Sequence, residues 1–214
     1  MNIILLAPPA GGKGTQSAMI CSKYNIPHIS TGDLLRKEVE NGNIEIKRIM
    51  DTGALVSDEI VFDLLKKRIS DQDCNNGYVL DGFPRNVTQA IEYDKILEDL
   101  NKDIGYVILL DVDKDVAAKR ISGRVSCPNC GNVYNIHFDS MKPKNENICD
   151  NCNNTLIKRD DDNEETYMTR YNTYLEKTQP LIDYYKNKGV LYTVSTDGTA
   201  EDTFERINNI VRGD

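Results

Sequence analysis

The chain has 214 residues and a net charge of −8, with 39% hydrophobic and 28% charged residues. These proportions are typical of a globular protein, and no apolar run approaches the roughly 20 residues of a membrane-spanning helix. Because the chain is acidic, it is unsuited to a broad nucleic-acid surface, which needs clustered cations.

The N-terminal segment has neither a basic leader nor a long apolar stretch, so we expect a cytoplasmic protein. Short apolar runs predict strands at residues 3–6, 28–30, 78–80, 106–110 and 190–194. Helices are predicted at residues 13–24, 58–70, 87–100, 113–122, 163–187 and 200–211. This alternation predicts an α/β fold, a three-layer sandwich in which helices cover both faces of a five-stranded parallel sheet.

Two segments interrupt this alternation. Residues 31–56 have a polar, helical pattern without a strand, and residues 123–160 contain four cysteines but few helix-forming residues. We interpret both as insertions into a core formed by residues 1–30, 57–122 and 161–214.

The first predicted strand runs into Ala7-Pro8-Pro9-Ala10-Gly11-Gly12-Lys13-Gly14-Thr15, and a helix follows. Backbone N–H groups and the dipole at a helix N-terminus favour an anion, and glycines let the main chain approach a phosphate. Lys13 and Thr15 would then lie beside the outer phosphates. The segment departs from G-x-x-x-x-G-K-[ST] at Ala7 and Gly14, so a glycine-rich turn with an exposed lysine is the alternative.

A second polar segment follows the strand at residues 78–80. Asp81 ends this strand, and Arg85 lies in the turn after it. Because ligands of parallel sheets gather at the carboxyl ends of the strands, Asp81 is expected near Lys13, where it could hold a water of a magnesium ion. The alternative role for Asp81 is to cap the next turn.

The cysteines indicate a metal site. Two C-x-x-C pairs, Cys127 with Cys130 and Cys149 with Cys152, have the spacing of a structural zinc site. Free thiols or two disulfides are the alternatives. Cys21 and Cys74 are interpreted as buried apolar residues, and His28 and His137 are assigned no role.

Together these segments resemble the adenylate kinase family of nucleoside monophosphate kinases, in its bacterial form with a long, zinc-binding lid. The resemblance also rests on residues 29–36, 80–85, 122–124, 159–166 and 197–199 and spans nearly the whole chain. It implies the reversible, Mg²⁺-dependent reaction of ATP with AMP to give two ADP, which maintains adenine nucleotide balance, by a monomer. Residues 31–56 would form the AMP-binding lobe and residues 123–160 the lid.

The resemblance also implies roles for individual residues. The catalytic cations would be Lys13, Arg36, Arg85, Arg124, Arg159 and Arg170. ATP would contact Ala10, Gly11, Gly12, Lys13, Gly14, Thr15, Arg120, Arg124, Val133, Tyr134 and Ala200. AMP would contact Thr31, Arg36, Ala54, Leu55, Val56, Gly82, Phe83, Pro84, Arg85, Gln89, Arg159 and Arg170. Asp33 and Asp81 would bind waters of the magnesium ion, and Cys127, Cys130, Cys149 and Cys152 would bind zinc.

The sequence departs from the family pattern at three positions of interest. Ala7 and Ala10 replace glycines, and Val125 replaces the second of two tandem lid arginines. We predict that both alanines have φ < 0, because alanine rarely adopts positive φ.

Two other functions remain compatible with the sequence. One is a kinase that phosphorylates CMP, UMP or GMP. The other is a nucleic-acid-binding zinc ribbon attached to an inactive P-loop domain, which the acidic charge disfavours.

Overall fold

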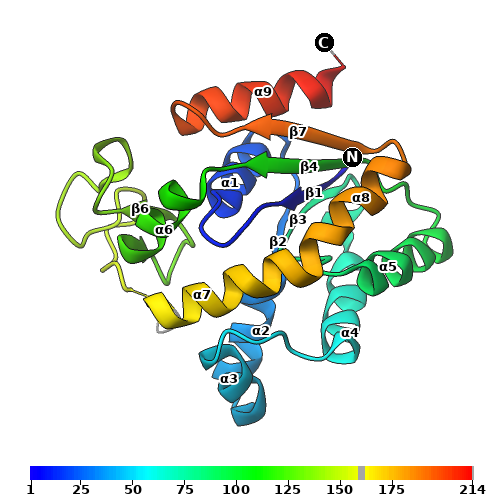
Figure 1. Cartoon of the computed structure of the whole chain (residues 1–214), viewed down its shortest axis with the longest axis horizontal. Coiled ribbons are helices and arrows are strands. Elements are labelled where there is room, and N and C mark those ends of the chain that lie inside the picture. The colour runs from blue at the N-terminus through cyan, green and yellow to red at the C-terminus, as the bar shows by residue number, and fades with distance from the viewer. Residues whose placement is uncertain (159–161, 214) are drawn as a thin grey trace.

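The computed structural model describes residues 1–158 and 162–213. Its centre is a parallel sheet with strand order β2-β3-β1-β4-β7, shown in Figure 1. The strands are β1 (Asn2–Leu6), β2 (His28–Ser30), β3 (Tyr78–Asp81), β4 (Tyr106–Asp111) and β7 (Leu191–Ser195). The predicted five-stranded parallel α/β fold is therefore confirmed.

Helices connect the strands and cover the sheet on both faces. They are α1 (Lys13–Tyr24), α4 (Asp58–Ile69), α5 (Val87–Asp99), α6 (Lys114–Ser122), α7 (Glu164–Thr173), α8 (Gln179–Asn187) and α9 (Ala200–Arg212). A short 3₁₀ turn, η1 (Gln72–Cys74), precedes β3. In the described part of the chain, none of the helices has the length and apolar character that a membrane span requires.

The central strand β1 shows why three layers form. Its side chains alternate between two buried clusters: Ile4 and Leu6 pack with residues of α4, α5 and α8, whereas Ile3 and Leu5 pack with residues of α1 and α9. Successive side chains of a strand point to opposite faces, so a strand that is apolar from Ile3 to Leu6 needs helices on both sides.

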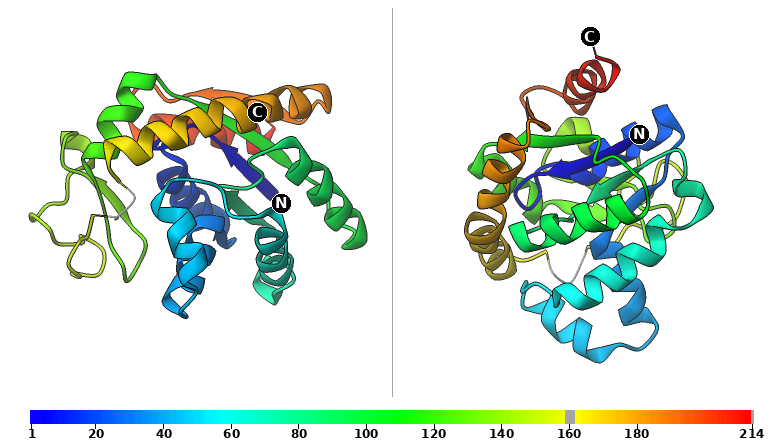
Figure 2. Two further views of the ribbon diagram at one scale, coloured as in Figure 1. Left: turned by 60° about the horizontal axis from the view of Figure 1, so that its bottom comes forward. Right: turned by 90° about the vertical axis from the view of Figure 1, so that its right-hand side faces the viewer.

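Two projections extend from this core, as Figure 2 shows. The first contains α2 (Thr31–Glu40) and α3 (Ile44–Asp51). The second contains the antiparallel pair β5 (Arg124–Ser126) and β6 (Val133–Asn135), followed by the 3₁₀ turn η2 (Asp139–Met141). Two further bridges, Ser126 to Ile157 and Ile148 to Thr155, fold the second projection back on itself.

The helix predicted over residues 163–187 is interrupted. A π-helical segment, η3 (Tyr174–Thr178), joins α7 to α8, and such wide turns are frequent at functional sites. Hydrophobic periodicity did not reveal this segment, because one wide turn barely changes the pattern.

Candidate active site

A cavity of about 450 Å³ opens at the carboxyl ends of β1, β2 and β3. Among the described residues, nearly every one predicted to contact nucleotide or magnesium lines it. The exceptions are Phe83, whose ring packs in the core against Phe62 and Tyr93, and Ala200, whose carbonyl accepts a hydrogen bond from Gln16. Arg159 lies outside the described residues.

The loop between β1 and α1 forms one wall of the cavity. Gly12 precedes α1 with φ 89°, a left-handed conformation that favours glycine. Lys13 is the first residue of α1, and its Nζ donates to the carbonyl of Ala7 at 3.2 Å. The loop therefore presents a helix N-terminus and a lysine to the cavity, an arrangement suited to phosphate.

The prediction that both loop alanines have φ < 0 is wrong for Ala10, which has φ 59°. Ala7 does not share this conformation. A Cβ atom on Gly11 would lie 2.6 Å from the Cβ of Ala7 and 2.9 Å from the carbonyl of Pro8. Ala7 thus places a methyl group where the glycine of the family pattern would leave space. Gly11 has no side chain and therefore leaves room for this methyl group.

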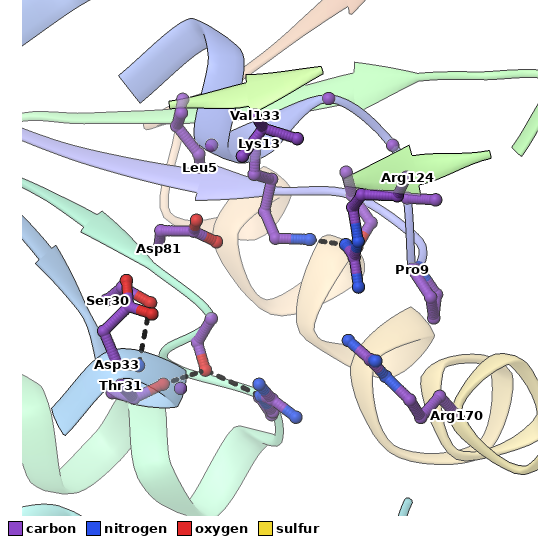
Figure 3. A pocket seen from close by; sticks show the side chains of 18 of the residues that line it. Leu5, Pro9, Lys13, Ser30, Thr31, Asp33, Asp81, Arg124, Val133 and Arg170 are labelled. Atoms are coloured by element: carbon purple, nitrogen blue, oxygen red, sulfur yellow. Dashed lines mark hydrogen bonds between the residues drawn. The ribbon is translucent and has the colours of Figure 1, made fainter. Parts of the chain in front are cut away.

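Several cations converge on Lys13. Burial lowers the pKa of Lys13 to about 8; the neighbouring Asp81 opposes this shift, and Arg85, Arg170 and Arg124 add to it. Figure 3 shows Lys13, Arg124 and Arg170 directed into the same space. This excess of positive charge suits a ligand with several negative charges.

The loop after β3 is fixed by hydrogen bonds to one carbonyl. The Oγ1 of Thr31 and the Nε of Arg85 both donate to the carbonyl of Gly82, at 2.9 and 2.7 Å. The hydroxyl of Thr178, in η3, donates to the carbonyl of Arg85 at 2.8 Å. These contacts hold Arg85 at the cavity, between the start of α2 and η3.

Two acidic residues predicted near magnesium have different surroundings. Asp33 forms an ion pair with Arg36 within the first turns of α2. Asp81 lies 3.5 Å from the Nε2 of His28. Burial by itself would raise the pKa of Asp81, but the neighbouring His28 and Lys13 outweigh burial and lower this pKa to about 2. Asp81 is therefore ionised at neutral pH.

Sequence reasoning missed Asp162. Its side chain is fully buried, and its carboxylate accepts a bidentate pair of hydrogen bonds from Arg124. Arg170 approaches the same carboxylate at 4.0 Å. Asp162 lies in the segment 159–166, in which the sequence indicates a role only for Arg159, so only the fold reveals this contact.

The second projection reaches the phosphate loop. A Cβ atom on Gly14 would lie 3.9 Å from Val133, and one on Gly12 would lie 3.8 Å from the guanidinium of Arg120. Burial lowers the pKa of Arg120, and its Nε has no hydrogen-bond partner among the described residues. Arg120 and Val133 therefore close one side of the cavity.

The four predicted cysteine ligands come together within this projection. Their sulfur atoms lie within 4.8 Å of one another, with Cys127 and Cys152 at 3.4 Å and Cys130 and Cys149 at 3.5 Å. Four sulfurs around a zinc ion at about 2.3 Å would be about 3.8 Å apart, whereas a disulfide needs about 2.05 Å. The four sulfurs therefore fit a tetrahedral metal site and not two disulfides.

Tyr134 connects this cysteine cluster to the cavity. Its hydroxyl lies 3.5 Å from the Sγ of Cys149 and accepts a hydrogen bond from the backbone N–H of Asp150. The hydrogen bond from Tyr134 contributes most to lowering the pKa of Cys149 to about 6, whereas burial raises the pKa of Cys127 to about 11. A thiol that ionises readily is a good metal ligand.

A parallel sheet with a phosphate-binding loop and converging cations at its carboxyl edge defines a P-loop phosphotransferase. Residues 5–190 match the family profile described as adenylate kinase. The chain is 46% identical to an adenylate kinase of Acetivibrio thermocellus, over 100% of this chain and 99% of the relative. It is 48% identical to an adenylate kinase of Archaeoglobus fulgidus, over 94% of this chain and 92% of the relative.

The chain belongs to the adenylate kinase family. This confirms the predicted enzyme class, a nucleoside monophosphate kinase with adenylate kinase function. The four-cysteine cluster is also compatible with the predicted zinc-binding lid.

Proposed function

We propose that the cavity binds ATP and AMP together and transfers the γ-phosphoryl group of ATP to the phosphate of AMP. ATP would occupy the side formed by the phosphate loop, Arg120 and Val133. AMP would occupy the side formed by α2, residues 54–56 and the loop after β3. The observation that carries this proposal is the convergence of Lys13, Arg85, Arg124 and Arg170 between the two sides.

This arrangement suits phosphoryl transfer. The attacking phosphate oxygen of AMP is ionised near neutral pH, so the reaction requires alignment and charge stabilisation and no general base. The planar guanidinium groups of Arg36, Arg85, Arg124 and Arg170 can each bind phosphate oxygens in pairs. Arg159 would join them, and Lys13 would act on the charge that develops on the transferred group.

Magnesium fits the acidic part of this site. Asp81 is ionised beside Lys13, and Asp33 lines the same cavity. Mg²⁺ usually binds phosphates and retains several waters, so these carboxylates would hold waters of the ion. When bound, the ion would neutralise charge on the ATP phosphates.

Zinc fits the cysteine cluster. Cys127, Cys130, Cys149 and Cys152 would complete a tetrahedron of thiolates, which leaves no position for water or substrate. The metal would therefore be structural, holding together a projection with very little apolar core.

The two projections would form mobile units, an AMP-binding lobe over residues 31–56 and a lid over residues 123–160. Their closure would exclude water, which would otherwise hydrolyse ATP. We propose that this enzyme acts as a cytoplasmic monomer.

A coupled assay of ADP formation tests the reaction. The purified enzyme is incubated with Mg-ATP and with AMP, CMP, UMP or GMP in turn. We expect AMP to be the preferred acceptor by kcat/KM. A higher kcat/KM with CMP, UMP or GMP would contradict the proposed specificity.

A further inference from the structure

The side-chain amide of Gln89 is held from two directions. Its Nε2 donates to Oδ1 of Asp58 at 2.6 Å, and its Oε1 accepts from the backbone N–H of Arg85 at 2.7 Å. Asn86 caps α5 by accepting from the backbone N–H of Gln89, so Gln89 lies in the first turn, where a glutamine folds back over the helix start. Gln89 is 2% exposed and lines the cavity.

Both partners allow only one orientation of this amide. A carboxylate can only accept hydrogen bonds, and a backbone N–H can only donate. A 180° rotation of the amide would bring its oxygen against Asp58 and its NH₂ group against the N–H of Arg85. Two mismatched contacts at a buried position are costly, so the network itself assigns the oxygen and nitrogen of Gln89.

The fixed amide retains one N–H and one lone pair for a ligand. A 6-aminopurine presents the complementary pair, an acceptor at N1 and a donor at the 6-amino group. A 6-oxopurine presents the opposite pair, an N1–H donor and an O6 acceptor, and could be bound in the same position only by a rotated amide.

We propose that Asp58 is a specificity-determining positioning residue, which fixes the amide of Gln89 in the orientation that accepts a 6-aminopurine monophosphate and rejects a 6-oxopurine monophosphate. This inference rests on the proposed function, in which Gln89 faces the base of AMP. Asp58 is the stronger of the two constraints, because hydrogen bonds to a charged group are roughly twice as strong as neutral ones.

The isosteric variant Asp58→Asn tests this role. An asparagine can present either its oxygen or its NH₂ group to Gln89, so the amide of Gln89 can rotate at lower cost. The substrates to compare are AMP and inosine 5′-monophosphate, which differ in these two ring positions alone. We expect the AMP:IMP ratio of kcat/KM to fall about tenfold, mainly through KM, as expected when one hydrogen-bond mismatch of this kind is relieved.

Glu59→Gln is the matched control. Glu59 is exposed and lies beside Asp58 in the first turn of α4, so this variant removes the same charge from the same helix end. It should keep the wild-type AMP:IMP ratio. Asp58→Ser provides a second variant if the asparagine variant folds poorly, because a hydroxyl also donates or accepts.

Two outcomes separate this inference from the proposed function. If Gln89→Ala leaves the KM for AMP unchanged, Gln89 does not face the base and the proposed AMP site is wrong. If Gln89→Ala raises that KM while folded Asp58→Asn and Asp58→Ser variants keep the wild-type AMP:IMP ratio, the AMP site stands and the inference about Asp58 is overturned.

Discussion

The guanidinium of Arg124 and the carboxylate of Asp162 form a bidentate ion pair in which the aspartate side chain has no solvent exposure. A buried carboxylate is stable only when its charge is balanced, and Arg124 supplies that balance together with Arg170 at 4.0 Å. The same carboxylate therefore fixes the positions of two arginines to which we assign phosphate contacts.

Replacing Asp162 by Asn should lower kcat about 100-fold. The variant keeps the size of the side chain but removes the charge that orients Arg124, and small displacements of such groups can have effects of this size. Steady-state kinetics with both substrates measures this effect, and a melting curve shows whether the variant is folded.

Asp139→Asn is the control for Asp162→Asn. Asp139 pairs with Lys142 on the surface of the second projection, so its loss should leave kcat nearly unchanged, as for most exposed ion pairs. A folded Asp162→Asn variant with kcat within about twofold of wild type, a difference well below 1 kcal/mol, would contradict a positioning role.

Replacing Lys13 by Met should lower kcat by several orders of magnitude, on the order of the effects of lost transition-state contacts. It should not lower the melting temperature at pH 7. The folded state holds the Lys13 proton less tightly than the unfolded chain does. The charged Lys13 therefore lowers the free energy of unfolding below pH 8. This destabilisation disappears as the pH rises from about 8 towards 10.5, the ordinary pKa of lysine. Retention of more than about a tenth of wild-type turnover would contradict the role of Lys13.

The pKa of Lys13, about 8, also predicts a decline of kcat/KM above pH 8. The free enzyme loses the lysine charge over this range, whereas a bound phosphate would raise the pKa and move the decline of kcat to higher pH. Lys13→Arg is the control, because arginine keeps its charge. The residual kcat/KM of this variant should show no decline near pH 8. If its pH profile instead matches that of the wild type, another group titrates.

The sheet and the cysteine cluster could be predicted because their signals are local. An apolar strand such as residues 3–6 can be recognised from residues that are close together in the sequence. The same is true of the C-x-x-C spacing. Asp58 and Asp162 could not be identified in this way, since each acts on a residue 31 or 38 positions away. The prediction for Ala10 was wrong because it relied on the intrinsic preference of alanine for negative φ. In the structure, the surrounding loop instead holds Ala10 at φ 59°.

Replacing Ala10 by Gly should raise the free energy of unfolding by up to about 1 kcal/mol, because it removes a Cβ from a left-handed residue. Ala7→Gly should act in the opposite direction, since Ala7 is buried in the core and lacks positive φ and the change only frees the unfolded chain. Thermal or urea unfolding of both variants measures the difference. Equal destabilisation by both would show that Ala10 is not strained.

Zinc removal should lower the thermal stability of the lid without abolishing the chemistry. In the second projection the buried apolar cluster consists of Cys127, Tyr134, Cys149 and Leu156, and two of these four are themselves proposed ligands. A module with so little apolar core needs a metal or a disulfide, and the sulfur separations exclude the disulfides.

We therefore expect metal analysis to find one zinc ion per chain. The binding energy of the metal would become folding energy of the lid, so Cys130→Ser should lower the melting temperature while much of the turnover remains at low temperature. Cys21→Ser, in α1 outside the cluster, should retain zinc. Protein purified without chelator that contains no zinc would contradict the site. Complete loss of activity on zinc removal, with the lid still folded, would instead make the metal catalytic, which a four-thiolate site without an open position does not permit.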